Sequence, residues 1–144
     1  MILSTAAWQE ACILIPKVLE EDCQLVNGIK LSPAERASTL DIMFWELKVP
    51  DQENAKKSTY ITWRSDRNNP TEFADGKALQ RLVSGRIDIY SNNTRSDSYM
   101  AALLSLIDQK FTDKDWNVDL DVYEYIEALN RYHFGFELVT IITG

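Results

Sequence analysis

The stretch Leu79–Ser91, which reads LQRLVSGRIDIYS, restricts the fold of this chain more than any other part of the sequence. Its residues alternate between two sides of an extended chain, and this two-residue period is typical of a sheet that is buried on one face. The first side carries Val83, Gly85, Ile87 and Ile89, and the second side carries Leu82, Ser84, Arg86, Asp88 and Tyr90. The pattern predicts a long strand in or near the middle of a sheet.

Arg86 and Asp88 determine the character of the second side of this strand. Two charges buried in the core of a monomer would need matched partners, so this side is either solvated or in contact with a polar neighbour. We therefore expect a neighbouring element or molecule on this side. The alternative is a half-exposed strand that carries ordinary surface charges.

Three further segments have the composition of strands. The segment at about 59–66 is rich in β-branched and aromatic residues, and those at 116–126 and 131–141 alternate between apolar and polar residues. A short connection at 127–130 would join the last two into an antiparallel hairpin. The segment 65–77 contains Asn-Pro and Asp-Gly, which favour turns, so we predict a long loop there.

Three helices are predicted from apolar residues at helical spacing, at about 5–21, 33–46 and 97–110. Pro16 should kink the first helix or divide it into two short helices. The residues from Ser32 to Glu35 form a capping-box sequence at the start of the second helix. Within the second helix, the segment 42–45 could equally be a short strand.

The order of these segments predicts an α+β fold in a single domain that spans residues 1–144. The predicted sheet has four strands, at about 59–66, 79–91, 116–126 and 131–141, and is largely antiparallel. The helices are expected to pack mainly on one face of this sheet. A length of 144 residues is that of one domain.

Charge and hydropathy exclude several classes of protein. A formal net charge of −7 at pH 7 repels phosphate and disfavours tight binding of nucleic acid through a basic face. No apolar run has the length of a bilayer span, so no membrane contact is expected. The N-terminus lacks the features of a secretion signal, which predicts a protein that is made and kept in a cytoplasm. Cys12 and Cys23 are accordingly expected to be reduced thiols.

The sequence has no glycine-rich phosphate loop, nucleophile elbow or helical metal motif. The best enzymatic candidate is an acidic cluster with His133 as general base or ligand, whose carboxylates are Asp66, Asp75, Asp88 and Glu137. A histidine in an alternating strand is more often a hydrogen-bonded structural residue. Asp119 and Asp121 could bind a cation, but a solvated strand face explains them more simply. We therefore predict no enzymatic activity, catalytic residue, cofactor or metal.

A set of segments between Thr59 and Val139 carries a resemblance to a known family. The set comprises TYITWRSD at 59–66, a polar loop with Asn68, Asn69 and Ala74-Asp75-Gly76, GRIDIY at 85–90, an amphipathic helix and YHFGFEL at 132–138. Together these segments resemble the tail terminator and tail-to-head joining proteins of long-tailed bacteriophages. The resemblance covers a little over half of the chain. The segment Lys30–Ser58 departs from it, because its helix and loop are additional to the family's shorter pattern.

The resemblance implies a structural virion protein without enzymatic activity, which forms a hexameric ring that caps the tail tube. Such a ring stops polymerisation of the tail and offers the surface that docks the filled head. The implied partners are further copies of this chain, the tail tube protein and the head-completion protein. DNA would pass through the ring without specific binding, helped by the acidic charge. The implied location is the virion tail, after assembly in the bacterial host cytoplasm.

A closed ring uses one interface repeatedly, so each subunit must carry matching patches. We hypothesise that Arg81, Arg86 and Asp88 lie at or near this subunit contact. A head-completion connector and a tail-tube component are neighbouring alternatives. A small acidic enzyme or a DNA-mimicking inhibitor is a further alternative, and a mimic would bind a basic DNA-handling protein with steep salt dependence.

Overall fold

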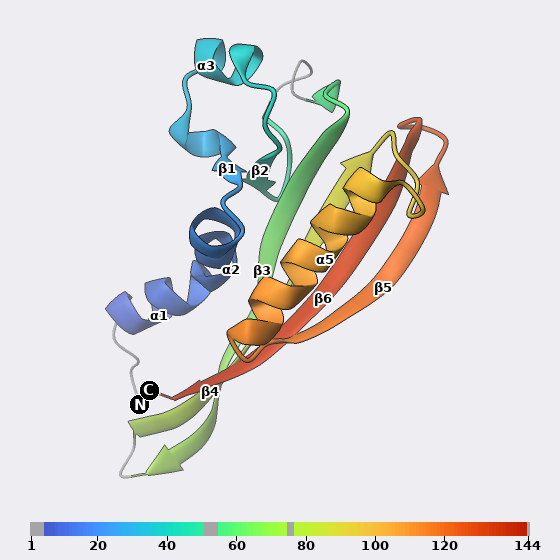
Figure 1. Cartoon of the computed structure of the whole chain (residues 1–144). Helices are drawn as coiled ribbons and strands as arrows, with labels where there is room; N and C mark the ends of the chain where they lie inside the picture. The colour runs from blue at the N-terminus through green and yellow to red at the C-terminus, as the bar shows by residue number, and fades with distance from the viewer. Residues whose placement is uncertain (1–4, 51–54, 75–76, 144) are drawn as a thin grey trace.

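Six strands form one mixed sheet in the computed structural model of the chain, which describes residues 5–50, 55–74 and 77–143 (Figure 1). Their bounds are Val26–Asn27 (β1), Met43–Glu46 (β2), Thr59–Ala74 (β3), Lys77–Ser91 (β4), Asn117–Ile126 (β5) and Arg131–Thr143 (β6). The order across the sheet is β1-β2-β3-β4-β6-β5. The α+β prediction is confirmed, whereas the prediction of four largely antiparallel strands is wrong, since β1, β2 and β3 pair in parallel.

β4 lies inside the sheet, between β3 and β6, and pairs antiparallel with both. On one side of β4, Val83, Ile87 and Ile89 are buried in the main core. On the other side, Arg86 and Asp88 are only partly buried. The prediction of an interior strand with one apolar and one polar side is therefore confirmed.

β5 and β6 form the predicted antiparallel hairpin, with β5 at the edge of the sheet. In the turn, the Leu129 N–H donates to the Ile126 carbonyl oxygen at 3.2 Å, and the Asn130 N–H donates to the Glu127 carbonyl oxygen at 3.1 Å. Asn130 has a left-handed φ of 53°, a conformation that asparagine adopts more readily than most residues.

The segment predicted as a helix at 33–46 is a short helix followed by a strand. α3 (Pro33–Ser38) begins with the predicted capping box at Ser32 and ends before β2. In β2, Met43 and Trp45 are buried in a small second cluster, and Phe44 is buried in the main core. A strand that is buried on both faces carries apolar residues on both, so the sequence shows no alternation of apolar and polar residues from which a strand could be predicted.

The segment predicted as a helix at 5–21 is divided, as expected from its proline. It consists of α1 (Thr5–Cys12), α2 (Leu14–Lys17) and the π-helix η1 (Val18–Asp22). In a continuous helix, the ring of Pro16 would collide with the carbonyl group of Cys12, four residues earlier. The division falls accordingly at Ile13, between α1 and α2.

α5 (Ser98–Asp113) corresponds to the helix predicted at 97–110, and the Asp97 carboxylate caps it by accepting from the Met100 N–H at 2.9 Å. Its buried side consists of Met100, Leu103, Leu104, Ile107 and Phe111. α5 lies on one face of the sheet, roughly along the direction of the strands, and contributes to the same core as α1, α2 and η1 (Figure 1). Among the described residues, no helix is long and apolar enough to cross a membrane.

β3 continues to Ala74, so the prediction of a long loop at 65–77 is wrong over the residues that the structure describes. The pairing with β4 shifts register between Ser65 and Arg67 and twice more beyond Pro70, which indicates β-bulges. Beyond Trp63, β4 is the only described strand that pairs with β3. This half of β3 is therefore a sheet edge, where a proline is tolerated.

Candidate functional site: the polar face of the sheet

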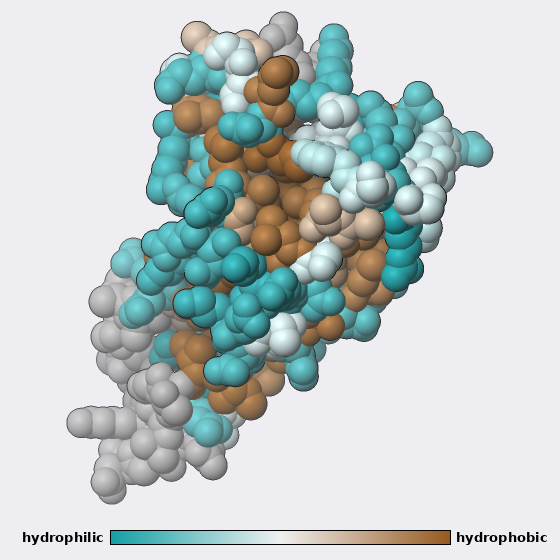
Figure 2. All heavy atoms as spheres, viewed as in Figure 1, coloured by the Kyte–Doolittle hydropathy of each residue, from teal (hydrophilic) through white to brown (hydrophobic). Residues whose placement is uncertain are grey.

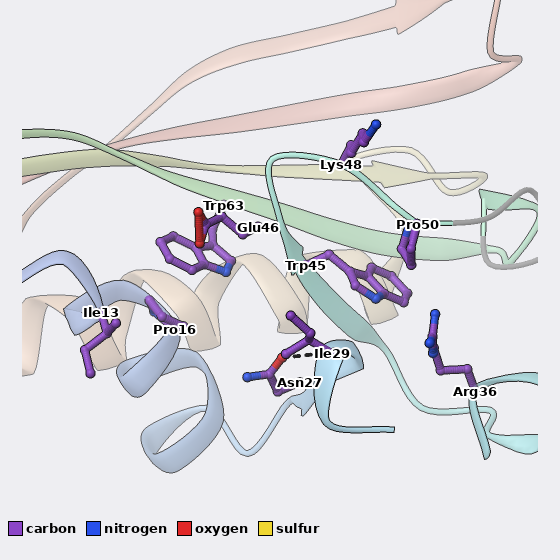
Figure 3. Close-up of a pocket in the computed structure, with 10 residues that line it drawn as sticks. All are labelled: Ile13, Pro16, Asn27, Ile29, Arg36, Trp45, Glu46, Lys48, Pro50 and Trp63. Atoms are coloured by element: carbon purple, nitrogen blue, oxygen red, sulfur yellow. Dashed lines mark hydrogen bonds between the residues drawn. The ribbon is translucent and has the colours of Figure 1, made fainter. Parts of the chain in front are cut away.

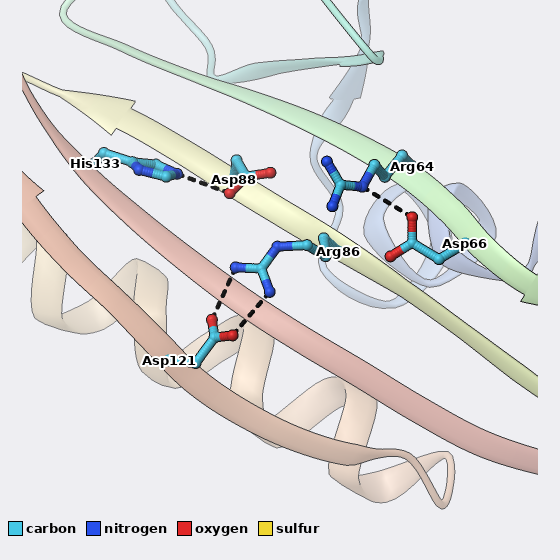
Figure 4. A network of polar contacts seen from close by, with 6 residues as sticks. All are labelled: Arg64, Asp66, Arg86, Asp88, Asp121 and His133. Atoms are coloured by element: carbon cyan, nitrogen blue, oxygen red, sulfur yellow. Dashed lines mark hydrogen bonds and ion pairs between the residues drawn. The ribbon is translucent and has the colours of Figure 1, made fainter. Parts of the chain in front are cut away.

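The face of the sheet opposite α5 carries a network of charged side chains (Figure 4). Its members are Arg64 and Asp66 on β3, Arg86 and Asp88 on β4, Asp121 on β5, and His133 on β6. They share a face because alternate residues of neighbouring strands in register point to the same side of the sheet. Figure 4 shows α5 behind the strands, so the network lies on the side that α5 does not cover.

Arg86 on β4 and Asp121 on β5 form a bidentate ion pair. Arg86 donates from Nη1 to Oδ2 and from Nη2 to Oδ1 of Asp121, both at 2.8 Å. A register shift between Leu120 and Val122 marks a β-bulge at Asp121. These hydrogen bonds raise the pKa of Arg86 and lower the pKa of Asp121. The pair spans β6, the strand between its two partners.

His133 joins three strands through both of its ring nitrogens. Its Nε2 lies 2.7 Å from Oδ1 of Asp88 on β4, and its Nδ1 lies 3.0 Å from Oε1 of Glu124 on β5. The imidazole ring stacks on Tyr90, with ring centroids 4.8 Å apart and planes 7° apart. The hydrogen bond to Asp88 is the main cause that raises the pKa of His133 above 6.5, against the effect of burial.

We expect the stability of the fold to fall as the pH rises through the folded-state pKa of His133. A raised pKa means that the pairing with Asp88 and Glu124 stabilises fully below pH 6.5 and is lost above the folded-state pKa. Urea unfolding across this window should show a lower free energy of unfolding at the higher pH. Because the chain has one histidine, His133→Gln should remove this dependence, and a wild-type stability that is flat across the window would contradict the account.

The carboxylates of the predicted enzymatic cluster are only partly brought together. Asp88 contacts His133, whereas Asp66 accepts a hydrogen bond from Nε of Arg64 at 2.9 Å on the same strand. Glu137 is paired in register with Arg86, and Asp75 lies outside the described residues. Among the described residues, no group of three or more histidine, cysteine, aspartate or glutamate side chains is placed to hold a metal ion.

The three residues of the hypothesised subunit contact have different environments. Arg81 is 4% exposed, on the side of β4 that faces the main core. Arg86 and Asp88 lie on the opposite, polar side and are bonded within the subunit to Asp121 and His133. An intersubunit bond at Arg86 would have to compete with its bond to Asp121. A role for these residues at a subunit contact stays a prediction.

A pocket of about 430 Å³ lies at the opposite edge of the sheet from β5, beside β2 (Figure 3). It is open to solvent on one side and is lined by residues from the start of α2 and the turn before it, β1 and the 3-10 helix η2 (Gly28–Lys30), α3, β2 with the segment after it, and β3. The residues that line it are Ile13, Pro16, Asn27, Ile29, Arg36, Trp45, Glu46, Lys48, Pro50 and Trp63. Two indole rings and four aliphatic or proline side chains give it an apolar lining, with charged groups at intervals. No sequence motif indicated this pocket, because five separate segments form it.

No protein-family model matches the sequence, and no curated protein is significantly similar to it. The resemblance to phage tail terminators therefore has no support from these comparisons.

Proposed function

We propose that this chain is a structural virion protein of the tail-terminator kind, which forms a ring at the end of the tail tube. In this proposal the ring stops growth of the tail and provides the surface on which the filled head docks. Its partners are copies of itself, the tail tube protein and the head-completion protein. DNA passes through the ring, and no catalytic step is involved.

The observation that carries the proposal is the acidic surface on the polar face of β4, β6 and β5. Exposed carboxylates on this part of the sheet come from Asp119, Glu124 and Glu137. Asp88 and Asp121 add two partly neutralised carboxylates beside them. A surface of this charge repels the phosphates of DNA, which suits the lining of a channel through which DNA must slide without binding.

The register of β5 against β6 strengthens this interpretation. Asp119 is directly opposite Glu137, and like charges at directly opposed positions destabilise a sheet. Glu137 is also opposite Arg86 on β4, which offsets part of this repulsion, whereas Asp119 is on the edge strand β5 and both carboxylates are exposed. A requirement for negative charge on this face would explain why the pair is tolerated.

Electron microscopy and native mass spectrometry of the purified chain test the assembly directly. We expect a closed ring with a central opening and a single oligomeric mass. Open filaments would instead favour a tail-tube component. A chain that stays monomeric at every concentration would contradict the ring and would favour the enzyme or inhibitor alternatives.

The assignment of the acidic face to the channel predicts a gain of DNA binding on charge reversal. In the double variant Asp119→Lys/Glu137→Lys, like charges still face each other between β5 and β6, but residue 137 also faces Arg86, so circular dichroism should first check that the variant is folded. We expect this variant to retain duplex DNA in a filter-binding assay, with retention that falls steeply as salt is added. The wild type should retain none.

The matched control for this experiment places the same charge change on the helical side. Asp108 and Asp113 are exposed on α5, and Asp108→Lys/Asp113→Lys alters the net charge by the same amount as the channel variant. If the ring encloses DNA with its polar face, the control should bind far less DNA. Equal binding by both variants would show that position is irrelevant and would contradict the channel assignment.

A DNA-mimicking inhibitor is the second candidate, because the same carboxylates could face a basic DNA-handling protein. A mimic would act as a monomer or small oligomer, and its binding to such a partner would weaken steeply with salt. A closed ring that shows no salt-dependent binding to a basic DNA-binding protein would exclude this candidate.

A further inference from the structure

The edge strand β5 is held to the sheet with little apolar burial. Every residue of β5 is exposed or only partly buried, and β6 is its one strand neighbour in the described part of the chain. Figure 2 shows mainly hydrophilic side chains around the turn between β5 and β6, whereas hydrophobic side chains gather between the N-terminal helices and α5. A strand with few buried apolar contacts opens easily, so polar links across the sheet matter more for β5 than for a core strand.

Two side-chain links among the described residues join β5 to β4 across β6. The first is the bidentate pair of Arg86 and Asp121. The second runs through His133, whose ring lies between Asp88 on β4 and Glu124 on β5. An arginine in a protein cannot lose its charge, whereas a histidine changes charge near neutral pH. The second link is therefore the one that pH can alter.

The geometry of the second link requires a charged imidazole ring. Nε2 of His133 lies 2.7 Å from Oδ1 of Asp88, and Nδ1 lies 3.0 Å from Oε1 of Glu124. An ionised carboxylate only accepts hydrogen bonds, so each ring nitrogen must donate one. A neutral ring has a single N–H, and one carboxylate would then face the lone pair of a ring nitrogen. The contact that loses the proton must lengthen.

Burial and distance indicate which carboxylate a neutral ring releases. The contact of Nε2 with Asp88 is the shorter one, and the Asp88 side chain is 16% exposed. The Glu124 side chain is 56% exposed. Water can solvate a released Glu124 carboxylate, whereas an Asp88 carboxylate without a partner would lie largely desolvated. The remaining proton should therefore stay on Nε2, between the ring and Asp88.

The other polar groups near the ring do not titrate in the same range. Around it, on the same face of β3, β4, β5 and β6, lie the charged or titratable side chains of Tyr60, Arg86, Tyr90, Asp121, Arg131 and Glu137. Burial raises the pKa of Tyr60 and of Tyr90, so neither tyrosine loses its proton near neutral pH. The chain has one histidine, so a change of charge near neutral pH on this face belongs to His133.

We propose that His133 is a pH-dependent clamp on the edge strand β5. In its charged form the ring joins Asp88 on β4 to Glu124 on β5. When the ring loses its Nδ1 proton, the Glu124 carboxylate separates from it and turns to solvent. The half of β5 from Val122 to Ile126 is then held less firmly, and the polar face becomes more negative. The clamp belongs to the single subunit, so it holds or fails independently of the proposed ring.

NMR of the uniformly labelled chain tests the proton positions, because one histidine gives a single set of imidazole signals. Long-range proton–nitrogen spectra distinguish the charged ring from its two neutral tautomers. We expect both ring nitrogens to carry protons in acid, and the Nε2–H tautomer to replace this form in a titration centred above pH 6.5. A titration centred at or below pH 6.5, or a neutral ring with its proton on Nδ1, would overturn the proposal.

Amide hydrogen exchange tests the response of β5. Protection factors of the backbone amides at 122–126 remove the intrinsic dependence of exchange on pH. We expect these factors to fall about two- to fivefold across the titration of His133, as for the loss of an exposed ion pair. Protection that stays constant while the ring titrates would overturn the clamp.

Glu124→Gln should abolish this response while it keeps a partner for the ring. The amide group accepts a hydrogen bond from the charged ring and donates one to the lone pair of the neutral ring, so both forms stay linked to β5. We expect constant protection at 122–126, with the midpoint of His133 moved to lower pH because one negative neighbour is gone. A response as large as that of the wild type would show that Glu124 is not the group released.

Asp119→Asn is the matched control, since it removes one negative charge from the same strand and the same face. Asp119 is exposed and is opposite Glu137, whereas Glu124 is opposite His133. This variant should keep the wild-type response of β5 to the titration of His133. Loss of the response here as well would assign it to the overall charge of the face and would overturn the clamp.

Discussion

Gly85→Ala is expected to lower the free energy of unfolding by about 3 kcal/mol or more, at the upper end of what overpacking costs. A Cβ atom at this position would lie 2.3 Å from the backbone oxygen of Arg64 and 2.4 Å from Cδ1 of Ile15. Ile15 could rotate, but the carbonyl belongs to β3, which is paired with β4 along its whole length. Relief would require the two central strands to separate locally. Urea unfolding followed by circular dichroism measures the change.

Gly135→Ala is the control for this prediction, because Gly135 sits on the neighbouring strand and also has close neighbours. A Cβ there would lie 2.6 Å from Nη2 of Arg86, which is the far end of a flexible side chain, and 3.0 Å from Cβ of Val122, which would have to shift by a few tenths of an ångström. That side chain can move at the expense of its bonds to Asp121, so we expect a smaller loss of about 1 kcal/mol. Equal losses in the two variants would show that the backbone of β3 yields as easily as an arginine side chain.

The sequence predicted those elements whose hydrophobic pattern is local because one of their faces is exposed to solvent. β4, the β5–β6 hairpin and α5 each present an apolar face and a polar face, so their periods of two or about 3.6 residues can be read directly. The broken N-terminal helix was also predictable, since a proline acts through its own backbone geometry.

β1 and β2 were not predictable from the same rules. β1 has two residues, and β2 is buried on both faces, so neither has a periodic pattern. Their parallel pairing depends on contacts between segments that are far apart in the sequence. The extension of β3 was missed for a different reason. Its turn-like Asn69-Pro70 is accommodated by bulges at a sheet edge rather than by a loop.

Only some members of the polar network could be identified from the sequence. Arg86, Asp88 and His133 could be singled out as charges on alternating strands, and the structure brings Asp88 and His133 together. Asp121 and Glu124 became partners because of the register of β5 and the bulge at residue 121. The identity of a partner across strands depends on a register that a single sequence does not determine.

Phe111→Ala should destabilise the fold by about 3–5 kcal/mol, the usual cost of deleting a buried phenylalanine side chain. Phe111 is fully buried in the last turn of α5 and meets Trp116 edge-on, with ring centroids 5.6 Å apart and planes 81° apart. Its carbonyl oxygen also accepts hydrogen bonds from the Lys114 and Trp116 N–H groups, at 3.0 and 3.1 Å. The ring contact and these backbone hydrogen bonds together fix the point at which the chain turns from α5 into β5.

The consequence of losing Phe111 should extend beyond the helix. With the cavity left by the ring, Trp116 loses its edge contact at the start of β5, so amide hydrogen exchange should accelerate in β5 more than in β3. Tyr99→Ala, in the first turn of the same helix and 54% exposed, removes a similar aromatic ring and should change stability by less than about 0.5 kcal/mol. If the two variants were equally stable, α5 would not be held to the sheet through its C-terminal turn.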